Sequence, residues 1–193
     1  MAANPTASAP PRPIPTDEEL MALPKDGYKR ELLNGEIVMS PAGSEHGRKI
    51  VRFTTTLAGY VYQHDLGEVF DGQTGFRMKS RDVLSPDVSF VARERLIGLQ
   101  QAPEGFFEGA PDLAVELLSP GDSLKRLNQK LAQYFDNGAR LAWVMDSKRR
   151  IVRVHRSLRS HKILTDAEEL LGEEVVPGFH LPVATIFAPI THR

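Results

Sequence analysis

The chain has 193 residues, of which 41% are hydrophobic and 25% are charged, and its formal net charge is -1 at pH 7. These values are ordinary for a folded soluble domain, and they exclude the overall positive charge that is typical of avid, sequence-independent nucleic-acid binding. Because the chain contains no cysteine, disulfides and thiolate metal sites are excluded, which fits a reducing cytoplasm. No apolar run approaches the roughly 20 residues of a membrane helix, so we expect a cytoplasmic protein.

The N-terminal part of the chain divides into two segments. Residues 1–15 are rich in proline and alanine, so we expect a disordered lead rather than a signal peptide, followed by a single domain over residues 16–193. Thr16 and Glu19 have the spacing of a capping box, which predicts a short helix that ends before Pro24.

A β-hairpin and a long helix are predicted next. Residues 28–33 and 36–40 are expected to form two strands, and Asn34-Gly35 between them is a strong signal for a tight hairpin turn. Over residues 43–64, apolar side chains recur at helical spacing, which indicates a helix that buries one face. His46 lies at the start of this helix.

The middle of the chain consists of short runs separated by glycine, serine and aspartate. Three extended runs predict a strand meander over residues 67–71, 75–79 and 86–91. A helical turn is expected over residues 93–99. The loop at 100–111 contains Phe106 and Phe107, which we expect to anchor it in the core.

Residues 112–118 form a predicted buried strand that contains a carboxylate. Side chains alternate between the two faces of a strand, and here both faces are apolar except at Glu116. A buried carboxylate is costly unless positive charge meets it, and a metal ion is the usual solution when a second carboxylate is near. Asp87, at the start of the apolar run 86–91, is the candidate for that second carboxylate.

A second amphipathic helix is predicted over residues 123–137, with Ser123 or Asp122 as its N-cap. Its apolar residues recur at helical spacing, and they are Leu124, Leu127, Leu131, Tyr134 and Phe135. Lys130 lies on the same stripe and is therefore expected to point inward. An inward lysine beside two inward carboxylates provides the groups for metal-assisted phosphodiester hydrolysis.

The C-terminal third is predicted to contain a core strand at residues 141–145, a hairpin partner at 148–154 and a final helix at 181–187. Trp143 is expected to be a core residue. Residues 148–162 contain seven lysines and arginines and no acidic residue. This local basic segment is expected to face DNA, a partner subunit or solvent.

Several short motifs occur together in a characteristic order. They are Tyr28-Lys29-Arg30-Glu31-Leu32-Leu33-Asn34-Gly35-Glu36-Ile37, Ser40-Pro41, His46, Pro86-Asp87, Glu116-Leu117-Leu118-Ser119-Pro120, Lys130 with Tyr134, and Trp143-Val144-Met145-Asp146. Over residues 16–187 the chain thereby resembles the Uma family of restriction-endonuclease-like proteins, a branch of the PD-(D/E)XK nuclease superfamily. The superfamily normally has a lysine at the position of Leu118, whereas this branch has it on the following helix, which corresponds here to Lys130.

The resemblance implies an α/β fold with a restriction-endonuclease-like core, in which helices flank a central mixed β-sheet. It also implies hydrolysis of DNA phosphodiester bonds, with Asp87 and Glu116 as ligands of Mg²⁺, or of Mn²⁺. Lys130 would act on the attacking water or on the scissile phosphate. Because one chain contains one candidate site and a duplex has two strands, we expect a homodimer.

Two further residues and one alternative function remain open at this point. Glu31 is expected either to join the metal site or to be an ordinary hairpin carboxylate, and His46 either to act near the phosphate or to be a helix-start residue. The alternative to an enzyme is a non-catalytic module that binds nucleic acid or self-associates while keeping the nuclease fold.

Overall fold

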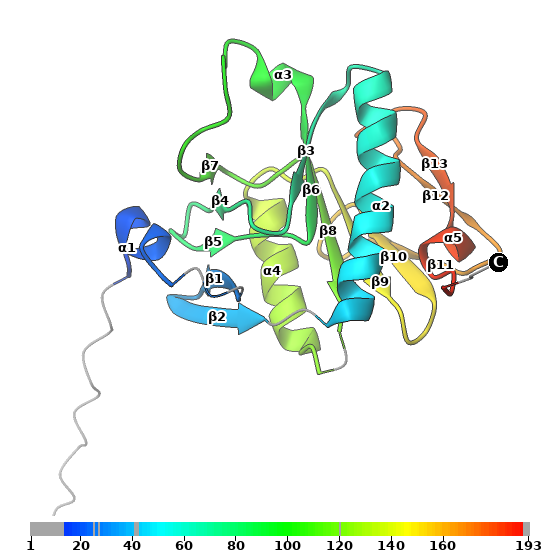
Figure 1. Cartoon of the computed structure of the whole chain (residues 1–193), viewed down its shortest axis with the longest axis horizontal. Helices are drawn as coiled ribbons and strands as arrows, with labels where there is room; N and C mark the ends of the chain where they lie inside the picture. Colours follow the sequence, from blue (N-terminus) through cyan, green and yellow to red (C-terminus); the bar gives the residue numbers. More distant parts are fainter. Residues whose placement is uncertain (1–13, 25, 27, 41–42, 120, 191–193) are drawn as a thin grey trace, which may run out of the picture.

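The computed structural model in Figure 1 describes residues 14–190 except 25, 27, 41–42 and 120. Most of the predicted disordered lead therefore lies outside the described residues, as do Pro41 and Pro120 of the motifs above. The helices are α1 (Asp17–Met21), α2 (Ser44–Gln63), α3 (Arg93–Leu96), α4 (Leu124–Asp136) and α5 (Val183–Ile186). Within the described residues, no helix is long and apolar enough to cross a membrane.

A six-stranded mixed sheet forms the centre of the fold, in the order β11-β10-β9-β8-β6-β3. In chain order these strands are β3 (Gly67–Asp71), β6 (Val88–Ala92), β8 (Leu113–Leu118), β9 (Leu141–Asp146), β10 (Ile151–His155) and β11 (His161–Leu164). β8 and β9 pair in parallel and are connected through α4, whereas the other neighbours pair antiparallel. The predicted central mixed sheet with flanking helices is thus confirmed.

A smaller sheet has the order β2-β1-β5-β4-β7, and a separate pair joins β12 to β13. These strands are β1 (Lys29–Leu33), β2 (Glu36–Ser40), β4 (Phe76–Arg77), β5 (Val83–Leu84), β7 (Phe107–Glu108), β12 (Glu169–Leu171) and β13 (His180–Pro182). β1 and β2 form the predicted hairpin, and Asn34 and Gly35 both have the positive φ, 53° and 75°, that a tight primed turn requires.

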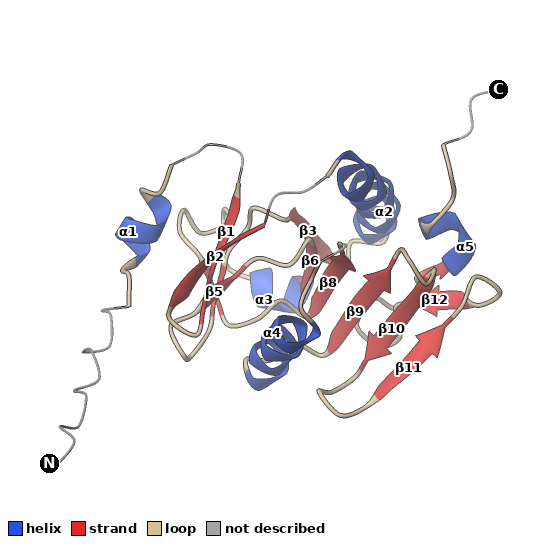
Figure 2. Ribbon diagram, turned by 90° about the horizontal axis from the view of Figure 1, so that it is seen from below, coloured by secondary structure: helices blue, strands red, loops and turns tan. Residues whose placement is uncertain are grey.

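Two hydrophobic layers cover opposite faces of the six-stranded sheet. On one face, Phe53 and Leu57 of α2 pack with Trp143 of β9, which confirms Trp143 as a core residue. On the other face, Leu131 and Tyr134 of α4 pack in a second cluster that also includes residues of the smaller sheet. Figures 1 and 2 show α2 and α4 on opposite sides of the strands. β8 is buried from both sides, which explains its apolar character on both faces.

Three sequence predictions of local structure are wrong. The meander over 67–91 is split, because β3 pairs with β6 in the central sheet while β4 and β5 join the smaller sheet under α4. The segment 181–187 begins as β13, which pairs with β12, and only its later part is helical. Leu124 was predicted to belong to the buried stripe of the second amphipathic helix, but it is 62% exposed. It is the first residue of α4, and the buried residues of this helix begin at Leu127.

Candidate active site

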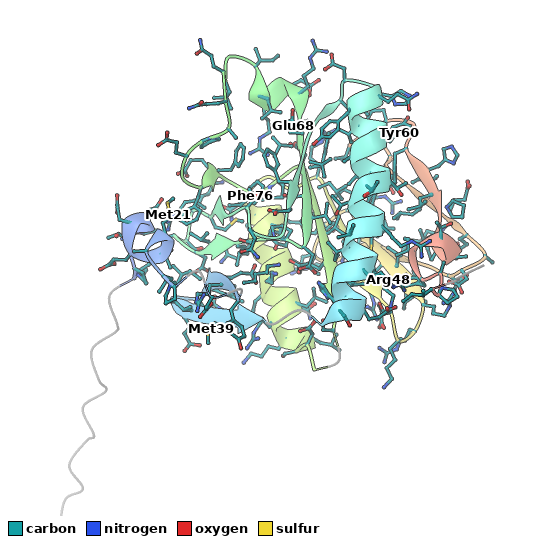
Figure 3. All side chains as sticks on the ribbon, in the orientation of Figure 1. Met21, Met39, Arg48, Tyr60, Glu68 and Phe76 are labelled. Carbon is teal, nitrogen blue, oxygen red and sulfur yellow. The ribbon has the colours of Figure 1, made fainter. Side chains whose placement is uncertain are left out.

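All five residues that the sequence analysis selected line one cavity of about 500 Å³. They are Glu31, His46, Asp87, Glu116 and Lys130. The cavity lies where the hairpin β1–β2, the N-terminal end of α2, strand β8 and helix α4 meet. Met39 of β2, labelled in Figure 3, also lines it.

Asp87 and Glu116 are brought together by the pairing of two central strands. β6 and β8 run antiparallel with Val88 opposite Val115, so continuing this register by one position places Asp87 opposite Glu116. The backbone N–H of Leu117 donates a 2.8 Å hydrogen bond to Asp87 Oδ2, which fixes that carboxylate against β8. The two side chains are 12% and 11% exposed, so both acids lie deep in the cavity wall.

Lys130 is clamped between two carboxylates on the α4 side of the cavity. Its Nζ lies 2.6 Å from Glu116 Oε1 and 3.0 Å from Glu31 Oε1. Tyr134, one turn later on the same helix, donates a 2.6 Å hydrogen bond to Glu116 Oε1, and Ser85 N–H donates one of 2.7 Å to Glu31 Oε1. Burial would lower the pKa of Lys130, but its acidic neighbours raise that pKa well above the usual range. The ammonium is therefore charged.

Asp87 is also held by a lysine and a histidine from two other elements. Lys29 Nζ lies 2.8 Å from Asp87 Oδ1, and His46 Nε2 lies 3.5 Å from Asp87 Oδ2. The other ring nitrogen of His46 lies 3.1 Å from Ser119 Oγ, which orients the imidazole toward the acid. The sequence analysis did not select Lys29. The available signal was its position two residues before Glu31, because residues at this spacing on a strand share a face.

The two acids have different proton affinities despite their similar burial. Burial alone would raise the pKa of Asp87, but the charges of Lys29 and Lys130 and the contact with His46 hold it well below its usual range. Burial raises the pKa of Glu116 against the attraction of Lys130, and the negative charge of Asp87 adds to this effect. Asp87 is therefore the firmly ionised member of the pair.

The oxygen donors in this cavity suit a hard divalent cation. Mg²⁺ typically binds one or two carboxylates and completes its shell with water and substrate oxygens, and Asp87 and Glu116 supply two such carboxylates. Among the residues that the structure describes, no three His, Asp or Glu side chains are grouped to hold a metal. This donor set does not match a zinc site, which usually has three or four protein ligands.

The basic segment 148–162 lies away from the cavity and is largely neutralised. Five of its seven cations form ion pairs with acids from elsewhere in the described fold, namely Arg149 and Arg153 with Asp146, Arg150 with Asp166, Arg156 with Glu173, and Lys162 with Glu168. None of the seven lines the cavity. A count limited to residues 148–162 missed these acids because they lie just outside the segment, at positions 146, 166, 168 and 173.

The central mixed sheet, its two covering helices and the acid–lysine cavity define a restriction-endonuclease-like α/β protein. The chain belongs to the Uma2 family, described as "Putative restriction endonuclease", whose model matches residues 17–184. The family resemblance deduced from the ordered motifs is thus confirmed.

A solved structure has the same fold. It is described as a "putative nuclease belonging to DUF820" from Anabaena variabilis, and it aligns with a TM-score of 0.76 over 89% of this chain and 97% of that chain. The sequence identity is 18%, so this likeness establishes the fold. No match was found among curated proteins.

Proposed function

We propose that this protein is a metal-dependent endonuclease that hydrolyses DNA phosphodiester bonds. The observation that carries the proposal is the convergence of Asp87, Glu116 and Lys130 on one cavity, with Glu31 and His46 beside them. Membership of a family described as "Putative restriction endonuclease" supports the same reaction class.

In this proposal Asp87 and Glu116 hold Mg²⁺, or Mn²⁺ in its place. A bound divalent ion would polarise the phosphate and lower the pKa of an attacking water. Lys130 lies beside Glu116 and is assigned to the attacking water, while Glu31 holds Lys130 in place from the other side. Water adds to phosphorus and one phosphorus–oxygen bond of the backbone breaks, so no further reactant is needed.

His46 is assigned a supporting role at Asp87. Its Nε2 faces the carboxylate and its Nδ1 is tied to Ser119, so the ring helps to fix the acid that we assign to the metal. Its side chain is 17% exposed, which leaves an edge accessible from the cavity.

Cleavage of supercoiled plasmid DNA under a titration of Mg²⁺ tests the proposal. We expect nicked and linear products to appear as Mg²⁺ reaches the millimolar range and to be lost in Glu116→Gln. The matched control is Glu68→Gln, an exposed glutamate on β3 that does not line the cavity, labelled in Figure 3. Cleavage that persists undiminished in Glu116→Gln would contradict the assignment.

The alternative, a non-catalytic module on the nuclease fold, also has a supporting observation. Asp87 and Glu116 each contact an ammonium group in this structure, as expected of carboxylates that serve only folding. A cleavage assay distinguishes the endonuclease from the non-catalytic module. A module of this kind would bind DNA without cutting it at any Mg²⁺ or Mn²⁺ concentration.

We further propose that the protein works as a homodimer, since cutting both strands of a duplex takes two sites. Light scattering with and without DNA measures this directly. A monomer mass under both conditions would refute it.

A further inference from the structure

Lys29 is a cation of the cavity to which neither the sequence motifs nor the proposed roles give a function. We propose that Lys29 is the phosphate-binding residue of this site. Its ammonium group remains paired with Asp87 until a divalent cation and substrate bind. This inference rests on the proposed function, because it assigns the residue that receives the DNA phosphate.

The position of Lys29 follows from the geometry of β1. Lys29 and Glu31 are two residues apart, so both side chains extend from the same face of the strand, and both line the cavity. Glu31 reaches Lys130 on α4, whereas Lys29 reaches Asp87 immediately before β6. Strand β1 therefore contributes a carboxylate that contacts Lys130 and an ammonium group that contacts Asp87.

The two lysines of the cavity differ in their freedom to move. Lys130 contacts two carboxylates and is 8% exposed at its side chain, so leaving either partner would uncover a buried charge. Lys29 has one carboxylate partner among the described residues and is 13% exposed. A lysine side chain has a flexible stem and a compact charge, which lets Lys29 exchange one oxygen partner for another.

Charge balance gives the reason for such an exchange. Four carboxylates line the cavity, Glu31, Asp87, Glu116 and Asp122, and they exceed its three basic side chains, Lys29, Lys130 and Arg126, by one charge. Adding a divalent cation reverses the excess, and a phosphodiester group then restores neutrality. Lys29 must leave Asp87 Oδ1 if that oxygen is to bind a cation, and the incoming phosphate is the nearest group that needs its charge.

Three measurements on the full-length chain test this role. The variants are Lys29→Met, which keeps the apolar stem, Lys29→Arg, which keeps the charge, and Lys49→Met as the matched control. Lys49 forms a comparable ion pair, 3.0 Å from Glu45, but it does not line the cavity. Mn²⁺ affinity is measured by electron paramagnetic resonance, binding of a short fluorescein-labelled DNA duplex by anisotropy in Ca²⁺, and plasmid cleavage in Mg²⁺.

Lys29→Met is expected to change the first two affinities in opposite directions. Mn²⁺ should bind about tenfold more tightly, because the competing ammonium is gone. The duplex should bind at least several-fold more weakly, and cleavage should fall about 100-fold, the effect typical of losing one transition-state contact. Lys29→Arg should recover much of the duplex binding, and Lys49→Met should match the wild type in all three measurements.

Two results would overturn the inference. Unchanged Mn²⁺ affinity in folded Lys29→Met would show that the ammonium does not compete for Asp87. Tighter Mn²⁺ binding with undiminished duplex affinity would show that Lys29 occupies the acid without contacting phosphate. If the wild-type protein does not cut plasmid at all, the proposed function fails, while the Mn²⁺ and anisotropy measurements still decide the role of Lys29.

Discussion

The phenol of Tyr134 is fully buried and makes the 2.6 Å hydrogen bond that fixes Glu116 Oε1. Burial raises its pKa well above the usual value, and the Glu116 charge adds to the effect, so the hydroxyl remains a donor. We expect Tyr134→Phe to lower the free energy of unfolding by about 1–3 kcal/mol and cleavage by about tenfold, because Glu116 loses an oriented partner.

Tyr60→Phe is the control for this prediction. Tyr60 donates a 2.9 Å hydrogen bond to the Pro177 carbonyl near the far end of α2 from His46, and it does not line the cavity. Urea unfolding and plasmid cleavage are measured on both variants. An equal loss of cleavage in the two would mean that the Tyr134 effect is one of general stability.

Lys130 has a structural task besides its proposed catalytic one. Lys130→Met would leave Glu31 and Glu116 buried without their shared cation, so we expect the free energy of unfolding to fall by about 3–5 kcal/mol at pH 7. Burial already raises the pKa of Glu116 above its ordinary value, and removing the ammonium should raise it further. A folded-state pKa above the unfolded value favours the folded protein at low pH, so the loss should shrink as the pH falls from 7 to 5. Urea unfolding at both pH values tests this, and a pH-independent loss contradicts it.

A second substitution separates the two tasks of Lys130. Leu118 lies two residues after Glu116 on the same face of β8 and lines the same cavity, so its side chain points into the space that the ammonium serves. Leu118→Lys in the Lys130→Met background should restore part of the cleavage, provided that circular dichroism shows a folded protein. Full activity in Lys130→Met alone would remove Lys130 from the mechanism.

At the scale of residues, the sequence was sufficient where a polar group interrupts an apolar pattern. Glu116 in an apolar strand and Lys130 on an apolar helix stripe were recognised in this way, and the structure brings both to one cavity. Lys29 could not be found by the same logic, because its strand is only partly apolar and its partner Asp87 is 58 residues away. The pairing of Lys29 with Asp87 depends on how the hairpin β1–β2 packs against the central sheet, and a local sequence pattern does not predict this packing.

At the scale of elements, long periodic segments were predictable and very short strands were not. Helices α2 and α4 and the hairpin β1–β2 follow directly from apolar periodicity and turn residues. β4 and β5 are two residues each, too short to show an alternation that would indicate which sheet they join. Their placement under α4 is decided by tertiary packing, for example of the fully buried Phe76 and Leu84.

Strand β10 contains a buried histidine that should make the fold sensitive to acid. Burial lowers the pKa of His155 to about 4, with smaller contributions from stacked His161 and nearby Arg153, and neither ring nitrogen has a hydrogen-bond partner among the described residues. The His155 imidazole is therefore protonated more readily in the unfolded chain than in the folded protein. The free energy of unfolding should fall by roughly 2–3 kcal/mol as the pH falls from about 6.5 to 4.

The matched variants for this prediction are His155→Leu and His180→Gln, the latter at an exposed histidine. Thermal melts between pH 7 and 4 should show a smaller acid loss in His155→Leu than in the wild type. His180→Gln should follow the wild type. An unchanged acid loss in His155→Leu would assign it to other groups.

At the scale of the whole molecule, the charge distribution predicts weakly salt-dependent DNA binding. The net charge is -1, and the basic segment 148–162 is largely paired with acids. Lys29 and Arg126 are the more accessible of the cations that line the cavity. Contacts with about two or three phosphates give a slope near -2 to -3 for the logarithm of the association constant against the logarithm of salt concentration. Anisotropy titrations in Ca²⁺ measure it, and a slope steeper than about -6 would require a basic surface that this description lacks.

The central claim is that Asp87 and Glu116 together form one divalent-metal site. Anomalous diffraction from a crystal grown with Mn²⁺ tests it most directly, because the scattering peak locates the ion independently of activity. We predict one peak within coordinating distance, about 2.0–2.2 Å, of a carboxylate oxygen from each residue, with Lys29 moved from Asp87 Oδ1. A peak elsewhere in the molecule, or no peak while both carboxylates keep their ammonium partners, would contradict the account.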